Sequence, residues 1–539
     1  MRQATLAEVL AEALAAHGVS RIFGVPGGGS SLDVMQAAAG KGIDFVLTRS
    51  ENAAVMMAAA TADLDGTLGA ALTTKGPGVA NAANGMACAA LDRSPVMLIS
   101  DGFTGEESGF VTHQVFDQFA LLAPVCKRSS RLDTDDAAAE IRGLIELAKT
   151  PPYGPVHVEI AGSQARRTVA PDPAASKPRE YEEQIDAAGV EKAARLFRNS
   201  GRPVIVAGLE ARSRSVSRAL EVMARALCCP VLTTYKAKGV FDERRSQYVG
   251  TFTGGRAESE CVEQADLIVL CGLDPVELLR MPWRYSSPVV DIAEVRHPVH
   301  YVQPAASLHG PMAPALARLS NGLSQSRWAP SEIAQLRRGM AARLEYPGCE
   351  GLGPQQVVEL ALRAAVDLEV SPRIAVDAGA HMFSAMAFWP AARPHDVLIS
   401  NGLATMAYAL PAAIASALHE PERPAIAFTG DGGLLMCLGE LSVAAEQAAH
   451  VVVIAFNDQS LSLIDIKQQE RGLPARGVRW RAPDFARTME GLGGRGFRVD
   501  SADEYRAAVS EALRSEGPSL IDVRVDPGGY LAQMKSLRG

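Results

Sequence analysis

The sequence predicts an α/β protein of three domains, each built on a mostly parallel sheet flanked by helices. The chain has 539 residues, which is room for about three domains of ordinary size. Its hydrophobic content is 47% and its aromatic content only 5%, a balance typical of packed parallel sheets. Short apolar runs alternate with Ala-rich helical stretches, and such alternation predicts right-handed βαβ crossovers.

The chain begins with a segment of helical pattern, MRQATLAEVLAEALAAHG. Glu8 and Glu12 lie within its apolar periodicity, so an amphipathic helix is predicted and a secretory signal is not. Further on, FVLTRS has the pattern of a buried strand, and Glu51 opens the Ala-rich helix that follows it.

The two ends of the chain resemble each other. DFVLTRSENAAVMMAAATADL and LGAALTTKGPGVANAANG lie near the start, and DVLISNGLATMAYALPAAIASAL and PAIAFTGDGGLLMCLGE lie near the end. Each half runs strand, polar turn, Ala-rich helix, strand, glycine turn and helix, so two related domains are predicted to flank a third. The alternative is that Ala-rich α/β segments resemble one another through composition alone.

Two polar stretches predict the domain boundaries. Residues 166–183 and 324–354 are rich in polar and turn-forming residues and are interpreted as linkers. Four further strand candidates lie between them. The predicted domains are therefore 1–165, 189–325 and 355–539.

Composition also excludes several classes of protein. The net charge of −8 and the absence of a Lys/Arg run argue against nucleic acid as a partner. No apolar stretch approaches the roughly 18 residues of a membrane span. The eight cysteines form no C-x-x-C pair, so neither a disulfide framework nor a zinc site is expected and a reducing cytoplasm is the default compartment.

Gly430-Asp431-Gly432 and Asn457-Asp458 are the most informative motifs. Each ends a short apolar run, PAIAFT in the first case and HVVVIAF in the second. Because the chain between Asp431 and Asp458 is long enough for one helix and the next strand, two neighbouring strand ends can direct oxygen ligands at one cation. Glycines after Asp431 let backbone N–H groups approach a phosphate, and Mg²⁺ prefers oxygen ligands completed by cofactor phosphates. The alternative is a glycine turn followed by an unrelated Asn-Asp loop.

These motifs resemble the diphosphate-binding motif of thiamine-diphosphate-dependent enzymes, GDG followed by NN or ND. The resemblance covers nearly the whole chain and is greatest to acetolactate synthase catalytic subunits and the decarboxylases and carboligases around them. It implies that 1–165 binds the pyrimidine of thiamine diphosphate, that 189–325 is a central domain, and that 355–539 binds the diphosphate and Mg²⁺.

The resemblance also implies the cofactor site. In the family an apolar side chain bends the cofactor, and Met406 occupies that position, while the carbonyl of Ala404 receives the 4′-amino group. Asp458 stands where most relatives have Asn and adds a negative charge. The metal ligands are Asp431, Asp458 and the backbone carbonyl of Ser460. The cofactor-binding residues are Gly379, Ala380, His381, Ala404, Met406, Gly430, Asp431, Gly432, Gly433, Asp458 and Ser460.

The catalytic residues implied by the resemblance lie in the first domain. Glu51 is the glutamate that hydrogen-bonds N1′ of the aminopyrimidine and so promotes loss of the proton from the thiazolium C2. Considered alone, Glu51 is better explained as a carboxylate that stabilises a helix N-terminus, and the family context reverses this interpretation. His113 and Gln114 occupy a loop that faces substrate in relatives, and His113 is a candidate proton shuttle or simply a surface residue.

Three residues are candidates for contact with substrate, and one of them, Lys467, differs from the residue found in relatives. Biosynthetic acetolactate synthases carry a Trp where Lys467 stands here, so Lys467, together with Val25 and Leu463, is a substrate-side candidate. The segment GLDPVELL lacks the arginine that contacts FAD in those enzymes, which makes bound FAD doubtful.

The predicted function is decarboxylation of a small 2-oxo acid, pyruvate first, with ligation to an aldehyde or a second 2-oxo acid. The alternatives are a decarboxylase that releases an aldehyde and a catalytically silent homologue. A nucleotide-dependent dehydrogenase is disfavoured because no G-x-G-x-x-G stands between a strand and a helix. In the family the cofactor lies between two subunits, so a homodimer or homotetramer is expected.

Overall fold

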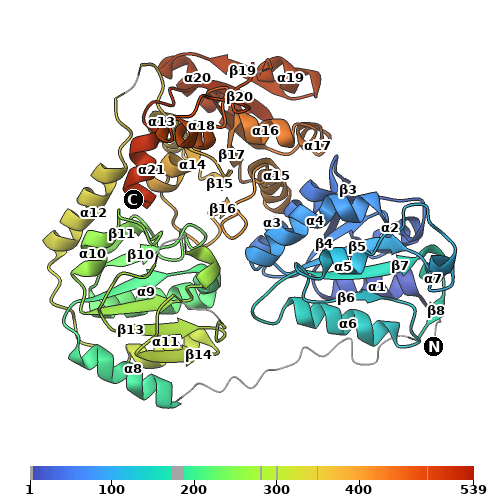
Figure 1. The fold of residues 1–539 in the computed structure, drawn as a ribbon, viewed down its shortest axis with the longest axis horizontal. Helices are drawn as coiled ribbons and strands as arrows, with labels where there is room; N and C mark the ends of the chain where they lie inside the picture. The colour runs from blue at the N-terminus through green and yellow to red at the C-terminus, as the bar shows by residue number, and fades with distance from the viewer. Residues whose placement is uncertain are drawn as a thin grey trace.

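The computed structural model describes residues 4–170, 187–278, 282–298, 301–348, 350–481 and 483–538. Three six-stranded sheets follow one another along this part of the chain, and every strand pairing within them is parallel (Figure 1). Helices cover the sheets. The predicted fold class is confirmed.

The first sheet has the strand order β3-β2-β4-β5-β7-β6. A short antiparallel pair, β1 with β8, joins the beginning of this domain to its end. The elements are β1 (Ala4–Thr5), α1 (Leu6–Ala16), β2 (Arg21–Val25), α2 (Ser30–Ala39), β3 (Asp44–Leu47), α3 (Glu51–Asp65), β4 (Gly69–Thr73), α4 (Pro77–Leu91), β5 (Val96–Gly102), η1 (Glu107–Gly109), α5 (Gln118–Leu122), β6 (Ser129–Arg131), α6 (Ala137–Ala148), β7 (Val156–Ala161), α7 (Gly162–Ala165) and β8 (Thr168–Val169).

The central sheet has the order β11-β10-β9-β12-β13-β14, the order of dinucleotide-binding folds. Its elements are α8 (Ala187–Asn199), β9 (Pro203–Ala207), η2 (Leu209–Arg212), α9 (Arg214–Leu227), β10 (Val231–Thr233), β11 (Tyr248–Thr251), α10 (Ser259–Glu263), β12 (Leu267–Cys271), η3 (Pro275–Glu277), β13 (Val289–Ala293), β14 (Ala306–His309) and α11 (Met312–Ser320).

The third sheet has the order β16-β15-β17-β18-β20-β19. Its domain contains α13 (Pro354–Asp367), β15 (Arg373–Val376), α14 (His381–Phe388), β16 (Val397–Ile399), α15 (Ala409–His419), β17 (Ala425–Gly430), α16 (Asp431–Met436), α17 (Glu440–Glu446), β18 (Val451–Asn457), α18 (Ser462–Glu470), α19 (Phe485–Gly491), β19 (Arg495–Val499), α20 (Ala502–Arg514), β20 (Ser519–Arg524) and α21 (Tyr530–Arg538).

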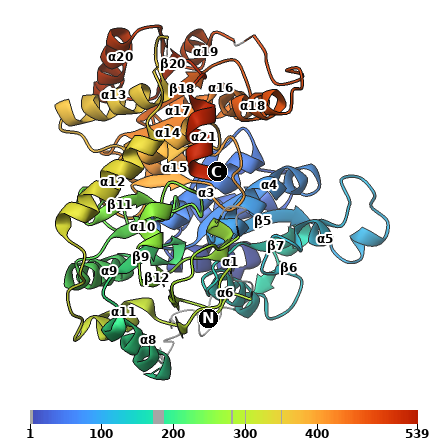
Figure 2. The same cartoon turned by 60° about the vertical axis from the view of Figure 1, so that its left-hand side comes forward.

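The two outer sheets share one topology. When the strands of each are numbered from its first strand, both sheets have the same order, whereas the order of the central sheet differs. The resemblance between the two ends of the sequence therefore reflects a repeated fold and not composition alone. The two outer domains also pack together, with α3 lying against α15 in both views (Figures 1 and 2).

The predicted second linker, 324–354, is wrong in part. It contains α12 (Pro330–Leu344), a helix of 15 residues. One face of α12 is buried, with apolar residues at helical spacing: Ile333, Leu336, Met340 and Leu344. The many charged residues of the other face hid this pattern. The first predicted linker lies mostly outside the described residues, since its part from 171 to 183 is not described.

Burial on both faces explains the apolar strands of the sequence. Every residue of β12, β17 up to Thr429, and β18 is buried, as expected for parallel strands with helices on both sides. Within the described chain, no helix combines the length and the apolar character that a membrane crossing requires.

Candidate active site

A cavity of about 270 Å³ lies at the carboxyl edge of the third sheet. Its walls come from the turn after β15, the segment after β16, the ends of β17 and β18, and the start of α21. The strand order reverses here, because β16 lies on one side of β15 and β17 on the other. Ligands of open α/β sheets bind at such a switch point.

The residues predicted to bind a cofactor all line this cavity, and Leu463 lines it too. They are Gly379, Ala380, His381, Ala404, Met406, Gly430, Asp431, Gly432, Gly433, Asp458 and Ser460. These residues come from four segments that are far apart in the sequence, and the fold brings them together.

Asp431 joins the ends of two neighbouring strands. It is the first residue of α16, and its Oδ1 accepts a hydrogen bond from the N–H of Gly432 at 3.0 Å. Its Oδ2 accepts from the N–H of Gln459, just after β18, at 2.9 Å. Gly433 has to be glycine, because a Cβ there would lie 2.2 Å from Oδ2 of Asp377. The backbone therefore turns tightly beneath the cavity.

Of the pair Asn457-Asp458, only Asp458 faces the cavity. Its Oδ1 accepts from the N–H of Ser460 at 3.1 Å, and its Oδ2 accepts from the hydroxyl of Ser462. Asn457 is buried in the sheet and donates to Oδ1 of Asp522 at 2.7 Å. Asn457 thus holds β18 against β20.

The two cavity carboxylates have raised pKa values. Burial, with the charge of Asp458 as the next cause, raises the pKa of Asp431 to about 7. Burial raises the pKa of Asp458 to about 6. A buried carboxylate and a half-buried one that repel each other are stabilised by a cation between them.

Asp377 holds the segment that carries Ala404 and Met406. Ala404 and Ala407 both have left-handed backbones, with φ of 52° and 67°, a strained conformation for residues other than glycine. Asp377, buried at the end of β15, accepts from the N–H groups of Ala407 at 3.1 Å and Tyr408 at 2.9 Å. These bonds keep the turn in place. The sequence analysis did not single out Asp377.

His381 lines the cavity. It opens α14 and stacks on Phe456 with 5.1 Å between ring centroids. Burial lowers the pKa of His381 to about 4, so the ring is neutral at physiological pH. Its Nε2 is buried and has no hydrogen-bond partner in the part of the chain that the structure describes.

Glu51 and Val25 do not belong to this cavity within the described chain. Glu51 opens α3, as predicted, and its carboxylate accepts a hydrogen bond from Asn81 of α4. Val25 is the last residue of β2. Both lie at the carboxyl edge of the first sheet.

The remaining candidates are exposed. His113 and Gln114 lie in the loop between η1 and α5, and Gln114 has a left-handed φ of 58°. Lys467 lies on the exposed side of α18. Its neighbour Asp465 is buried and pairs with Arg479 at 2.7 Å, which ties α18 to the segment after it.

The structure adds cavity residues that the sequence did not indicate. Tyr530 reaches the cavity from α21, far along the chain, and no motif marks it. Phe456, Ser462 and Ile464 also line it. They flank Asp458 and Ser460, so their proximity to the motif was the available signal.

Comparison with known families now identifies the class of protein. Residues 4–121 match the model of the N-terminal TPP binding domain of thiamine pyrophosphate enzymes, residues 190–319 the central domain, and residues 377–523 the C-terminal TPP binding domain. The chain belongs to the thiamine pyrophosphate enzymes.

Within that family its similarity runs to the acetolactate synthases and 2-oxo acid decarboxylases. It is 26% identical to acetolactate synthase of Bacillus subtilis, over 96% of this chain and 93% of that protein. It is 28% identical to a probable acetolactate synthase large subunit of Methanocaldococcus jannaschii (97% and 92% covered) and 27% to the catabolic acetolactate synthase of Raoultella terrigena (96% and 95%). The resemblance inferred from the motifs is confirmed.

A solved structure has the same fold. The thiamine diphosphate-dependent 4-hydroxybenzoylformate decarboxylase of Rhodococcus jostii RHA1 superposes with a TM-score of 0.82 at 22% identity, covering 97% of this chain and 99% of that one. This likeness supports the three-domain architecture.

The cavity fits the cofactor of the family. Thiamine diphosphate carries an anionic diphosphate, and the cavity is lined by glycine turns whose backbone N–H groups an anion can approach closely. Ser460 also lines it, and its hydroxyl has no hydrogen-bond partner among the described residues. Asp431 and Asp458 are the carboxylates that would hold a divalent cation here. The hydrogen-bond donors and the carboxylates of the cavity therefore suit a diphosphate bound together with a divalent cation.

Proposed function

We propose that this protein uses thiamine diphosphate and Mg²⁺ to decarboxylate a small 2-oxo acid, pyruvate first, and to join the product to a second carbonyl compound. The observation that carries the proposal is the cavity with two carboxylates and a glycine turn at the switch point of the third sheet. The acetolactate synthases among the relatives support the ligation step.

The chain's own residues would bind and orient the cofactor. Asp431, Asp458 and the carbonyl of Ser460 would hold Mg²⁺, and the turn from Gly379 to His381 would donate to the diphosphate. The carbonyl of Ala404 and the side chain of Met406 would fix the bend of the cofactor. When bound, its thiazolium supplies the electron sink that loss of CO₂ requires.

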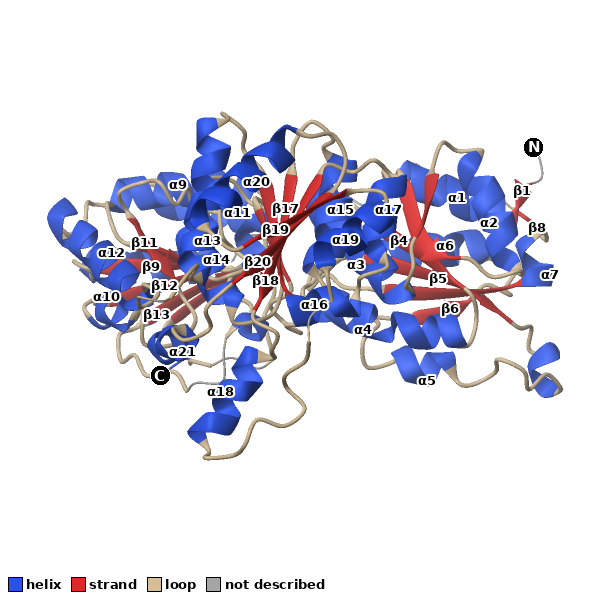
Figure 3. Ribbon diagram, turned by 90° about the horizontal axis from the view of Figure 1, so that it is seen from above, coloured by secondary structure: helices blue, strands red, loops and turns tan. Residues whose placement is uncertain are grey.

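Glu51 would hold a proton at N1′ of the aminopyrimidine, and it would do so from a second subunit. The described cavity of one chain does not include Glu51. Large apolar side chains are exposed on the elements around the two sheet edges, and a partner would cover them. They include Phe110, Val115 and Phe116 before α5, Leu435 and Met436 on α16, and Ile464 on α18. In Figure 3, α5, α16 and α18 lie along the same side of the molecule. We propose a homodimer, or a homotetramer built from such dimers.

Five residues would contact substrate once the dimer is formed: His113, Gln114, Val25, Leu463 and Lys467. Leu463 already lines the cavity, and His113 and Gln114 lie in the exposed loop before α5. His113 would deliver a proton to the reacting carbon. The seven cysteines of the described chain are free thiols, which suits the cytoplasmic location that we propose.

A decarboxylase that releases an aldehyde is the second candidate. It is favoured by Lys467, which stands in place of the acceptor-selecting Trp and is exposed on α18. Without an apolar acceptor site at that position, the product would leave as the aldehyde.

Titration of the purified protein with thiamine diphosphate and Mg²⁺, followed by circular dichroism, tests cofactor binding. Mass spectrometry of the products from a panel of 2-oxo acids, with and without aldehyde acceptors, then separates ligation from simple decarboxylation. Lack of binding, or full activity of a Glu51→Gln variant, would overturn the proposal.

We further expect the protein to retain no flavin. At the switch point of the central sheet, the buried carboxylate of Glu277 accepts from the N–H groups of Leu209 at 2.8 Å and Asp274 at 3.2 Å. These donors at the ends of β9 and β12 would otherwise be available to a cofactor phosphate. The visible spectrum of the purified protein checks this, and a bound yellow chromophore would contradict it.

A further inference from the structure

Lys236 lies where the three domains meet. It follows β10 of the central domain and is 5% exposed. Its Nζ donates to the carbonyl of Ile399, at the end of β16 in the third domain, at 2.9 Å. The same Nζ lies 3.3 Å from Oδ2 of Asp63 and 3.6 Å from Oδ2 of Asp92, both in the first domain. One ammonium group thus contacts all three domains.

Asp92 in turn holds the segment that leads to the cavity. Its Oδ1 accepts from the N–H groups of Asn401 at 2.9 Å and Gly402 at 2.8 Å. This segment continues to Ala404 and Met406, which line the cavity. Gly402 is pressed against the end of α4, because a Cβ there would lie 2.3 Å from the carbonyl oxygen of Leu91.

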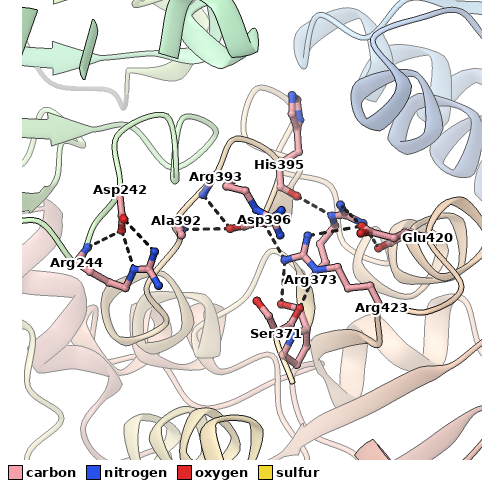
Figure 4. Close-up of polar contacts among 12 residues, drawn as sticks. Asp242, Arg244, Ser371, Arg373, Ala392, Arg393, His395, Asp396, Glu420 and Arg423 are labelled. Atoms are coloured by element: carbon pink, nitrogen blue, oxygen red, sulfur yellow. Dashed lines mark hydrogen bonds and ion pairs between the residues drawn. The ribbon is translucent and has the colours of Figure 1, made fainter. Parts of the chain in front are cut away.

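The other end of β16 is anchored separately. Just before β16, Asp396 accepts from Nη2 of Arg423 at 2.8 Å, and the carbonyl of His395 accepts from Nε of Arg373 at 2.9 Å (Figure 4). These contacts do not involve Lys236. Loss of Lys236 would therefore release the end of β16 that leads into the cavity and leave its beginning in place.

The two carboxylates depend on Lys236 to different degrees. Asp63 also pairs with Arg212 at 2.9 Å and accepts from the hydroxyl of Ser94 at 2.9 Å. Among the ion pairs of the described residues, Asp92 has Lys236 alone. Without Lys236, Asp92 would be a buried carboxylate without a cation, which proteins avoid by rearranging.

We propose that Lys236 is a positioning residue that acts through Asp92 and the Ile399 carbonyl to fix the segment Asn401–Met406 against the cofactor cavity. The central domain then contributes to cofactor binding although Lys236 does not line the described cavity. This inference rests on the proposed use of thiamine diphosphate.

Lys238 provides a matched control. It lies two residues further on in the same loop, is 2% exposed, and pairs with Glu243 of its own domain at 2.7 Å. Replacing either lysine by methionine removes one buried ammonium, which pairs with two carboxylates in the case of Lys236 and with one in the case of Lys238. Only the Lys236 variant affects Asp92, so general destabilisation is separated from a specific effect on the cavity.

The experiment compares wild type, Lys236→Met, Lys238→Met and the double variant Lys236→Met/Asp92→Asn. Isothermal titration with thiamine diphosphate at saturating Mg²⁺ gives Kd, and thermal unfolding of the cofactor-free protein gives Tm. Lys236→Met should weaken binding by about 10-fold or more, as changes behind a ligand-holding group commonly do. Lys238→Met should lower Tm with Kd within about 2-fold of wild type. The double variant should recover part of the affinity, because the asparagine introduced in place of Asp92 carries no charge yet still accepts from the two N–H groups.

Each outcome decides the matter. If wild type binds and Lys236→Met binds equally well, or if Lys238→Met weakens binding as much, the inference is overturned and the proposed function stands. If wild type itself does not bind, the proposed function fails. Should Lys236→Met not fold, Lys236→Gln, which keeps a donor for the Ile399 carbonyl but no charge, is judged by the same criteria.

Discussion

Asp458 lines the cavity, and its charge destabilises the protein when no cation is bound. It adds a second, half-buried carboxylate near Asp431 and helps to raise the pKa of that residue. Without a cation, this repulsion disfavours the folded state. The same charge strengthens attraction for Mg²⁺.

Replacement of Asp458 by Asn should therefore have opposite effects without and with metal. In the presence of a chelator, we expect Tm to rise, by about 2–4 °C for each kcal/mol of relieved repulsion. The increase of Tm on addition of Mg²⁺ should shrink. Ser460→Ala is the control, because it keeps the backbone carbonyl and should leave the response to Mg²⁺ unchanged. An Asp458→Asn protein that responds to Mg²⁺ like wild type would argue against Asp458 as a ligand.

His157 makes the stability of the first domain depend on pH. It lies fully buried on β7 with its Nε2 2.8 Å from the hydroxyl of Ser100. Burial lowers the pKa of His157 to about 3, whereas an unfolded histidine titrates near pH 6.5. Between these values the unfolded chain binds the extra proton, so stability falls as the pH is lowered from about 6.5 toward 3.

His157→Gln should reduce this acid sensitivity. Each pH unit inside the window corresponds to about 1.4 kcal/mol for a fully buried histidine. The dependence of the free energy of unfolding on pH should become weaker but not disappear. The reason is that burial also lowers the pKa of His381 to about 4 and that of His395 to about 3. Urea midpoints measured at pH 7.5 and pH 5 check this. Equal losses in variant and wild type would show that His157 does not titrate during unfolding.

At the scale of elements, the contact between α3 and α4 depends on one glycine. A Cβ at Gly85 would lie 2.7 Å from Cβ of Val55 and 2.9 Å from the carbonyl oxygen of Asn52. The two helices therefore approach more closely than any side chain at this position allows. Since α3 begins with Glu51, this contact also fixes where that carboxylate lies.

Gly85→Ala should destabilise the protein by about 1–3 kcal/mol, because it forces the two helices apart. Gly143→Ala on α6 is the matched change in the same domain: nothing lies within 4 Å of its Cβ position. It should stabilise by roughly 0.5–1 kcal/mol through helix propensity alone. Thermal unfolding of both variants tests the pair. Two shifts of the same sign would contradict the packing argument.

At the scale of the whole molecule, sequence patterns predicted what depends on short stretches of chain. The fold class followed from apolar runs with the length of strands, and Asp431 and Asp458 followed from strand ends rich in glycine and carboxylate. The other predicted cavity residues were implied by the family resemblance. Asp377 and Tyr530 were not found. Their contribution depends on packing between segments that are distant in sequence, as when Asp377 receives the N–H of Tyr408. The helix α12 was missed because charge on its exposed face outweighed four buried apolar positions.

Neither a sequence motif nor the structure of one chain shows whether an active site combines residues of two subunits. Complementation between two inactive variants tests this. Suppose that each active site combines Glu51 of one subunit with Asp431 of the other. Glu51→Gln and Asp431→Asn would each abolish activity alone. In a mixed dimer, one site would carry both substitutions and the other site neither. Co-expression of the two variants in equal amounts should then restore about a quarter of wild-type activity, since half of the dimers are mixed and each has one intact site.

The same co-expression distinguishes a site shared between subunits from a site built within one chain. In that case every site of every dimer would carry one substitution, and co-expression would restore nothing. A different affinity tag on each variant allows the mixed dimers to be isolated by two successive affinity steps. Size-exclusion chromatography then shows that they are dimers. Their activity should be half that of wild type per dimer. Inactive mixed dimers, with both parental variants folded, would place Glu51 and Asp431 in the same chain and remove the reason for a partner at the active site.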